Sequence, residues 1–182
     1  MGIFWSNNRK SNICFYQLNI CGEVLGMKYG LLTNLDAFEI QKYQQNRYPL
    51  LFIDYVEEAL PGKYAKGHKN FSFNEWFFPA HFEDEPNVPG FVQIEALTQM
   101  FLMTFLTIPE NKGKKTSFVK VDNAYFKKKI IPGDRLDIRS ELKLYSRGLA
   151  KGKSIGTVNG EDACGIDLTI CIPDILKQFS PK

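Results

Sequence analysis

Two residues that can move protons, His81 and Glu95, lie close together in the sequence. His81 is one of only two histidines, and Glu95 falls in the second turn of a stretch that is otherwise almost entirely apolar. Pro89 and Gly90 come immediately before that stretch, so the amides of Gly90 and Phe91 should lie unpaired at the positive end of a helix. A base, an acid and free amides are the groups needed to remove a proton beside a carbonyl while a hydroxyl leaves.

Each of these residues taken alone has a simpler interpretation. His81 by itself fits a hydrogen-bonded loop histidine. Glu95 by itself fits a structural ion pair or a capping interaction with the first helical turn, since a carboxylate without a partner is costly in an apolar setting. The catalytic interpretation rests on the whole segment 78–96, in which the base, the acid and the oxyanion donors are concentrated.

One long helix is the first element that must position this set. The sequence predicts it over 91–108, with Pro109 ending it, which gives about 27 Å at the standard rise. It is apolar nearly all round, as in a membrane span or in the buried centre of a domain. Glu95 and two nearby glutamines, in a segment barely long enough to span, favour burial inside protein.

Strand patterns flank this helix. A short helix over 35–40, capped by Asn34, is expected first. Asn159-Gly160 favours a type I′ turn between the last two strands. The expected strands cover 51–56, 63–73, 116–128, 136–145, 153–158 and 164–172. We therefore predict an α+β fold in which five to six antiparallel strands curl around the helix. Residues 27–182 should form this one domain, and residues 1–26 an N-terminal extension.

Composition narrows the class of protein. The 182 residues suit one domain, and the net charge of +3 is too small to indicate nucleic-acid binding. The four cysteines match neither a zinc motif nor a dense disulfide framework, so reduced thiols and a cytoplasmic location are expected. No signal peptide is visible. His68 lies among polar residues in an expected strand and should face solvent. The cysteines are Cys14, Cys21, Cys164 and Cys171.

Several short motifs along the chain agree in order and spacing with one family. They are Arg47-Tyr48-Pro49-Leu50-Leu51 with Asp54, Ala80-His81-Phe82 leading to Pro86, Pro89-Gly90 with Glu95-Ala96 and Gln99, and Phe126 before Ile131-Pro132-Gly133-Asp134. Over about residues 33–174 the sequence resembles the 3-hydroxyacyl-acyl-carrier-protein dehydratases of bacterial fatty-acid synthesis. The resemblance implies the hotdog fold, a long helix wrapped by an antiparallel sheet, and conversion of (R)-3-hydroxyacyl thioesters to trans-2-enoyl thioesters.

The resemblance also implies roles for individual residues. His81 would be the catalytic histidine and Glu95 the catalytic acid, contributed to one site by two protomers of a homodimer. The Gly90 amide would polarise the thioester carbonyl, with Phe91 and Phe82 beside the substrate. Gln99, one turn beyond Glu95, could orient the carboxyl. The reaction requires no metal or redox cofactor. The resemblance leaves open whether the dimers assemble further into a trimer of dimers.

The partner implied by the resemblance is acyl carrier protein. Three consecutive lysines, Lys127, Lys128 and Lys129, could meet the acidic helix residues of such a carrier, although a solvated strand end is an equally good interpretation. The chain departs from the family pattern at three places. It has Asn46 where histidine is usual, Ala80 where glycine is usual, and the acidic turn 83–85 where a Pro-Gly-basic turn is usual.

Two other functions remain open from the sequence. The same fold could hydrolyse an acyl thioester, which needs a carboxylate that activates water and does not need the specific pair of His81 and Glu95. The altered loops would also suit a non-catalytic acyl-thioester-binding subunit that pairs with an active partner. Retention of both reactive residues favours the dehydratase.

Overall fold

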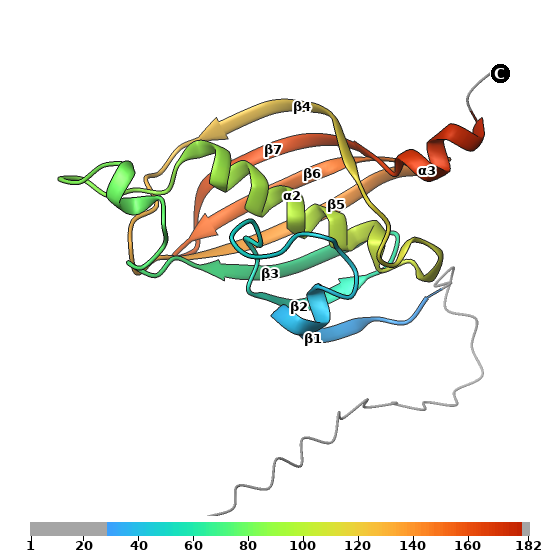
Figure 1. Cartoon of the computed structure of the whole chain (residues 1–182), viewed down its shortest axis with the longest axis horizontal. Coiled ribbons are helices and arrows are strands. Elements are labelled where there is room, and N and C mark those ends of the chain that lie inside the picture. Colours follow the sequence, from blue (N-terminus) through green and yellow to red (C-terminus); the bar gives the residue numbers. More distant parts are fainter. Residues whose placement is uncertain (1–28, 180–182) are drawn as a thin grey trace, which may run out of the picture.

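The computed structural model describes residues 29–179, in which one curved antiparallel sheet wraps around one long helix, α2 (Gly90–Leu106) (Figure 1). The strands are β1 (Leu32–Asp36), β2 (Tyr55–Leu60), β3 (Tyr64–Asn70), β4 (Ser117–Phe126), β5 (Arg135–Ser146), β6 (Leu149–Val158) and β7 (Glu161–Cys171). Their order across the sheet is β1-β2-β3-β5-β6-β7-β4, and all neighbours are antiparallel. This is the predicted α+β hotdog arrangement.

The described residues form seven strands, where five to six were predicted. The additional strand is β1, which pairs with β2 and covers part of the segment predicted as a short helix. That helix, α1 (Ala37–Ile40), begins two residues later than predicted. Its cap is Asp36, whose Oδ1 accepts hydrogen bonds from two backbone amides. The prediction failed because Asn34 and Asp36 are both good capping residues and the local pattern does not choose between them.

Small inward-facing side chains let α2 lie close to the middle of the sheet. In β6 every second residue faces the helix, and these residues are Ala150, Gly152, Ser154, Gly156 and Val158. A Cβ on Gly152 would lie 2.5 Å from the ring of Phe101 on α2. The helix in turn buries large apolar side chains, among them Leu97, Met100 and Phe105. Burial of each such side chain contributes about 1.5–3 kcal/mol, so this contact holds the site's helix in place.

Two hairpins, one before α2 and one after it in the sequence, turn at glycines with positive φ. Gly62 lies in the turn between β2 and β3 with a φ of 79°. Asn159 and Gly160 both have positive φ, as a type I′ turn requires, and they join β6 to β7. The remaining short helices are η1 (Phe78–Ala80), η2 (Pro109–Asn111), α3 (Pro173–Leu176) and η3 (Lys177–Phe179).

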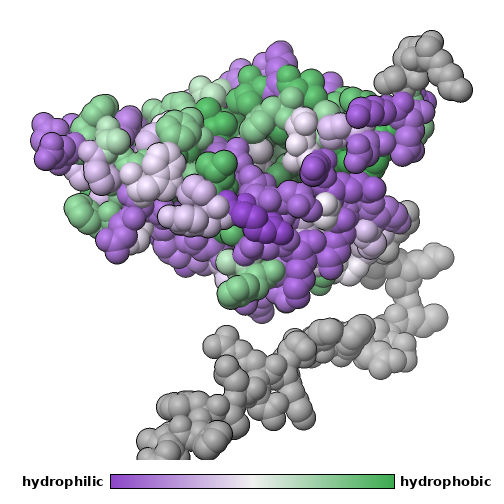
Figure 2. All heavy atoms as spheres, in the orientation of Figure 1, coloured by the Kyte–Doolittle hydropathy of each residue, from purple (hydrophilic) through white to green (hydrophobic). Residues whose placement is uncertain are grey.

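One edge of the sheet, β4, exposes a row of large apolar side chains. Phe118, Val119, Val121 and Phe126 are all exposed, with fractions between 36% and 54%. Figure 2 shows hydrophobic side chains gathered on the upper part of the molecule, where β4 runs. An apolar edge strand offers unpaired backbone groups to another chain. Within residues 29–179, no helix is long and apolar enough to cross a membrane.

Candidate active site

His81 lies in the loop between η1 and α2, where the backbone of Asn87 holds its ring. Its Nδ1 is 3.1 Å from the Asn87 carbonyl oxygen, and the Asn87 amide donates back to the His81 carbonyl at 2.9 Å. A carbonyl can only accept, so in the neutral ring Nδ1 carries the hydrogen and Nε2 keeps its lone pair. The ring is half-buried and stacks on Phe82 at 4.3 Å between centroids. Nε2 is therefore the atom that can accept a proton.

The N-terminus of α2 lies beside this histidine. No side chain caps it, and within the described part of the chain neither the Gly90 amide nor the Phe91 amide has a hydrogen-bond partner. A Cβ on Gly90 would lie only 3.3 Å from the ring of Phe126, so glycine leaves this ring room against the helix end. His81, Gly90 and Phe126 line one hollow of about 320 Å³. His81 and the Gly90 amide thus border one hollow, and their catalytic roles stay a prediction.

Glu95 is held by two amide side chains that bond to the same carboxyl oxygen. Gln99 donates to Oε1 at 2.8 Å and Asn46 donates to it at 3.1 Å. The backbone fixes Gln99, since its Oε1 accepts from the Phe52 amide at 2.8 Å and its Nε2 donates to the Leu50 carbonyl at 2.7 Å. The orienting role of Gln99 stays a prediction, which these bonds support. With Oε1 accepting both, the proton of the neutral carboxyl belongs on Oε2.

Burial changes the pKa of Glu95 in the direction that a proton donor needs. Removal from water raises the pKa of Glu95, and the hydrogen bonds from Gln99 and Asn46 oppose that rise. Glu95 opens into a cavity of about 550 Å³ between the 45–50 loop, α2 and the start of β4. This cavity shares no lining residue with the hollow of His81. A single chain therefore presents His81 and Glu95 in two separate hollows.

The three lysines proposed for carrier docking border the hollow of His81. Each has a carboxylate partner within the chain. The pairs are Lys127 with Asp162 at 2.6 Å, Lys128 with Glu161 at 2.6 Å, and Lys129 with Glu85. Glu85 belongs to the acidic turn that departs from the family pattern, so this turn neutralises one of the lysines. Their role in docking stays a prediction.

Two residues of the site had no assigned role in the sequence analysis. Asn46 was noted only as a departure, yet it bonds to the carboxyl group of Glu95. Asn87 holds His81 through its backbone, and its position between the histidine and Pro89 was the only available signal. Ala80, the second departure, is exposed, and its methyl group is not buried against the site.

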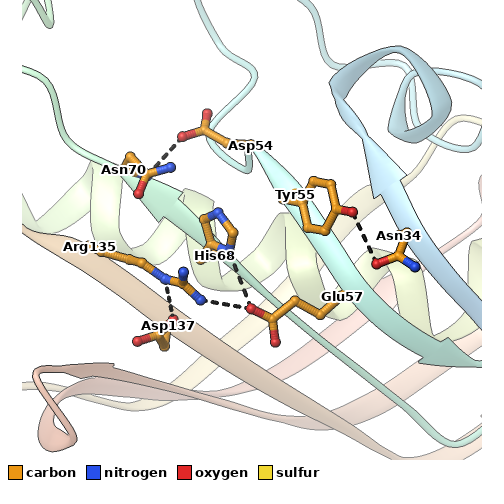
Figure 3. A network of polar contacts seen from close by, with 8 residues as sticks. All are labelled: Asn34, Asp54, Tyr55, Glu57, His68, Asn70, Arg135 and Asp137. Atoms are coloured by element: carbon orange, nitrogen blue, oxygen red, sulfur yellow. Dashed lines mark hydrogen bonds and ion pairs between the residues drawn. The ribbon is translucent and has the colours of Figure 1, made fainter.

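A polar network covers the sheet face opposite α2 (Figure 3). His68, predicted to face solvent, is only 15% exposed; it stacks on Tyr55 and its Nδ1 lies 3.4 Å from Glu57. Ligand atoms of Glu57, His68 and Asp137 lie within 4.8 Å of one another. Arg135 donates to both carboxylates, at 2.7 and 2.6 Å, so a guanidinium already satisfies the two acids. We interpret the network as an ion-pair cluster that joins β2, β3 and β5.

The described cysteines, Cys164 and Cys171, are buried free thiols, as expected; Cys14 and Cys21 lie outside the described residues. Burial raises the pKa of Cys164 to about 12, which keeps it protonated and unreactive.

Known proteins share this sequence over most of its length. The FabA-like domain model matches residues 45–167. The 3-hydroxyacyl-[acyl-carrier-protein] dehydratase FabZ of Clostridium novyi (strain NT) is 42% identical over 134 residues, which cover 74% of this chain and 94% of that protein. The FabZ of Bacillus subtilis (strain 168) is 40% identical over 139 residues, covering 76% and 98%.

Solved structures share the fold at low sequence identity. The dehydratase heterocomplex ApeI:P from Xenorhabdus doucetiae matches with a TM-score of 0.65 and 15% identity, covering 79% of this chain and 97% of that one. Cj0977, a sigma28-regulated virulence protein from Campylobacter jejuni, matches with a TM-score of 0.55 and 12% identity, covering 70% and 80%. On the family model and the sequence relatives, the chain belongs to the FabA-like dehydratase family.

Proposed function

We propose that this chain is a hydro-lyase that converts (R)-3-hydroxyacyl-acyl-carrier-protein thioesters to trans-2-enoyl thioesters and water, in fatty-acid or related acyl-chain synthesis. The observation that carries the proposal is Glu95, a half-buried acid whose two hydrogen-bond donors both bond to Oε1 and leave Oε2 to carry the proton. The FabZ relatives, about 40% identical over nearly their whole length, support the same reaction.

In the proposed mechanism, the free amide at Gly90 donates a hydrogen bond to the thioester carbonyl oxygen. That bond stabilises the negative charge that develops when the adjacent carbon loses a proton. Nε2 of His81 accepts this proton, because its Nδ1 hydrogen is bonded to the Asn87 carbonyl. The bond between carbon and hydroxyl then breaks, and Oε2 of Glu95 donates its proton so that the hydroxyl leaves as water. A double bond forms between the two carbons.

The complete site is proposed to form between two copies of the chain. The hollows of His81 and Glu95 are separate within one protomer, so the reacting groups need a second protomer to meet. The apolar edge strand β4 is a suitable contact, because Phe118 belongs to the Glu95 cavity and Phe126 to the His81 hollow. A twofold contact along β4 would bring the base of one protomer toward the acid of the other. The proposed assembly is therefore a homodimer with shared sites.

The two other functions find less support. Hydrolysis by a carboxylate-activated water needs an ionised carboxylate, whereas burial raises the pKa of Glu95 and favours its protonated form. A non-catalytic binding subunit would not need His81 fixed in one tautomer. A cytoplasmic location is proposed as well, which suits the free thiols of the described cysteines.

Enoyl formation tests the proposal. The purified chain is incubated with (R)-3-hydroxybutyryl thioester, on the carrier and on a short analogue, and enoyl absorbance is followed over time. We expect absorbance to rise to an equilibrium that is also reached from the enoyl thioester and water. If a folded dimer forms no enoyl product from either side, the dehydratase proposal is wrong. Release of free thiol in its place would identify a thioesterase.

A further inference from the structure

The cavity that contains Glu95 also has a cationic rim, formed by Arg47, Lys114 and Lys115. These residues come from two loops that hydrogen bonds join. The Gly113 amide donates to the Tyr43 carbonyl at 2.9 Å. The side-chain amide of Gln45 donates to the Gly113 carbonyl at 2.7 Å. The two loops are therefore held side by side, and so are the cations that they carry.

The rim carries positive charge without a matching acid. Within residues 29–179, Arg47, Lys114 and Lys115 have no carboxylate within 4.0 Å, whereas each of the lysines at 127–129 has one. Arg47 donates only to backbone carbonyls, which fix its guanidinium but leave its charge uncompensated. Three like charges around one cavity make the local potential positive, which attracts an anion. The missing counter-charge indicates a site for a negatively charged ligand.

The rim and the acid line the same cavity and differ in exposure, so they can contact two parts of one ligand. Neighbouring cations would lower the pKa of Glu95, yet among the described residues the groups that lower it are Gln99 and Asn46. The cations therefore leave the acid able to keep its proton. Lys115 and Arg47 are exposed, whereas Glu95 is half-buried, so the anion site lies toward solvent and the reacting end of the ligand lies inside.

We propose that Arg47, Lys114 and Lys115 bind the phosphate group of the pantetheine arm that carries the acyl thioester. This inference rests on the proposed function, because the substrate of a carrier-dependent dehydratase is a thioester on such an arm. The arm is long and flexible, with a phosphate at one end and the thioester at the other. Three donors that bind the phosphate hold one end of the arm in place, so that the thioester at the other end lies toward Glu95. Coenzyme A bears the same phosphate, so both forms of the arm should bind.

The test compares three (R)-3-hydroxybutyryl thioesters on Lys114→Ala/Lys115→Ala: the carrier-protein form, the coenzyme A form and the N-acetylcysteamine form, which lacks phosphate. We expect KM to rise about tenfold for the two phosphate-bearing substrates, with kcat unchanged, because two charged donors are lost. The N-acetylcysteamine substrate should be unaffected. The matched control is Lys120→Ala/Lys143→Ala, which removes two exposed lysines that do not line the cavity, and it should change none of the three.

Each other outcome overturns the assignment. An equal loss with all three substrates would mean that the lysines support the fold of the loop. A loss with the carrier substrate alone would mean that they contact the acidic surface of the carrier protein. No change with any substrate would remove them from binding altogether.

A binding measurement separates this inference from the proposed function. Calorimetry compares 4′-phosphopantetheine with pantetheine on the unsubstituted chain and on Lys114→Ala/Lys115→Ala. Tighter binding of the phosphorylated ligand, with the difference lost in the variant, is expected even if the chain proves not to dehydrate. Equal affinity for the two ligands would refute the phosphate site even if the enoyl product forms.

Discussion

The two hollows of this chain hold their reactive residues in different ways. Glu95 is fixed by side chains from two distant segments, Asn46 and Gln99, and Gln99 is itself anchored to the backbone. His81 is held within its own loop, by Asn87, whose carbonyl faces Nδ1, and by the ring of Phe82. The difference follows from the chemistry. The proposed acid needs a setting that favours its protonated form, and the proposed base needs a tautomer that leaves Nε2 free to accept a proton.

The largest loss of activity is expected when the reactive side chain of either hollow is removed. His81→Ala and Glu95→Gln should each lower kcat/KM by about 100-fold or more, because each removes one proton transfer. Initial rates of enoyl formation measure the loss, and circular dichroism with gel filtration confirms that fold and dimer persist. Near-normal activity in either variant would exclude that residue from the mechanism.

Changing the contacts of the acid should shift the pH dependence of the rate. Glu95 acts in its protonated form, so activity falls as pH rises through its pKa. The hydrogen bond from Asn46 lowers that pKa. Asn46→Leu should therefore raise it and move the alkaline limb of the kcat profile to higher pH, while the acidic limb stays in place.

Two further variants make the pH test specific. Asn46→His restores a donor and should return the alkaline limb toward its original position. Gln99→Leu should move the limb in the same direction as Asn46→Leu but also reduce thermal stability, because Gln99 bonds to two backbone groups. If Asn46→Leu does not move the alkaline limb, the hydrogen bond from Asn46 does not control the pKa of Glu95.

The smallest effect is expected at the lysines beside the base. Replacing Lys127, Lys128 and Lys129 together by glutamine should raise KM for the carrier substrate by no more than a few-fold, because their charges are already compensated by exposed ion pairs. The N-acetylcysteamine substrate serves as the control and should not respond. A rise larger than that of Lys114→Ala/Lys115→Ala would place the main carrier contact on this side of the molecule.

The sequence was sufficient for the parts of the fold that local patterns determine. The period of the later strands, the apolar character of α2 and the Asn159-Gly160 turn each follow from neighbouring residues, and all were predicted. The first expected strand, 51–56, was misplaced, since β2 spans Tyr55–Leu60. The boundary between β1 and α1 was not, because Asn34 and Asp36 both suit a helix cap and pairing with β2 decides between them.

Contacts between distant segments could not be predicted from the sequence. Asn46 and Glu95 are 49 residues apart, and only the folded loop brings them to 3.1 Å. His68 was expected in solvent because its sequence neighbours are polar, but Tyr55 and Glu57 on the adjacent strand cover it. The ion pairs of the lysines at 127–129 depend in the same way on partners 33 to 44 residues distant.

The most direct test of the central claim is complementation between two inactive chains. His81→Ala and Glu95→Gln chains carrying different tags are co-expressed, and mixed dimers are purified through both tags. If the base and the acid come from different protomers, each mixed dimer has one intact site and regains about half of the wild-type rate of enoyl formation. Mixed dimers as inactive as either parent would show that the two residues act within one chain, and would contradict this account.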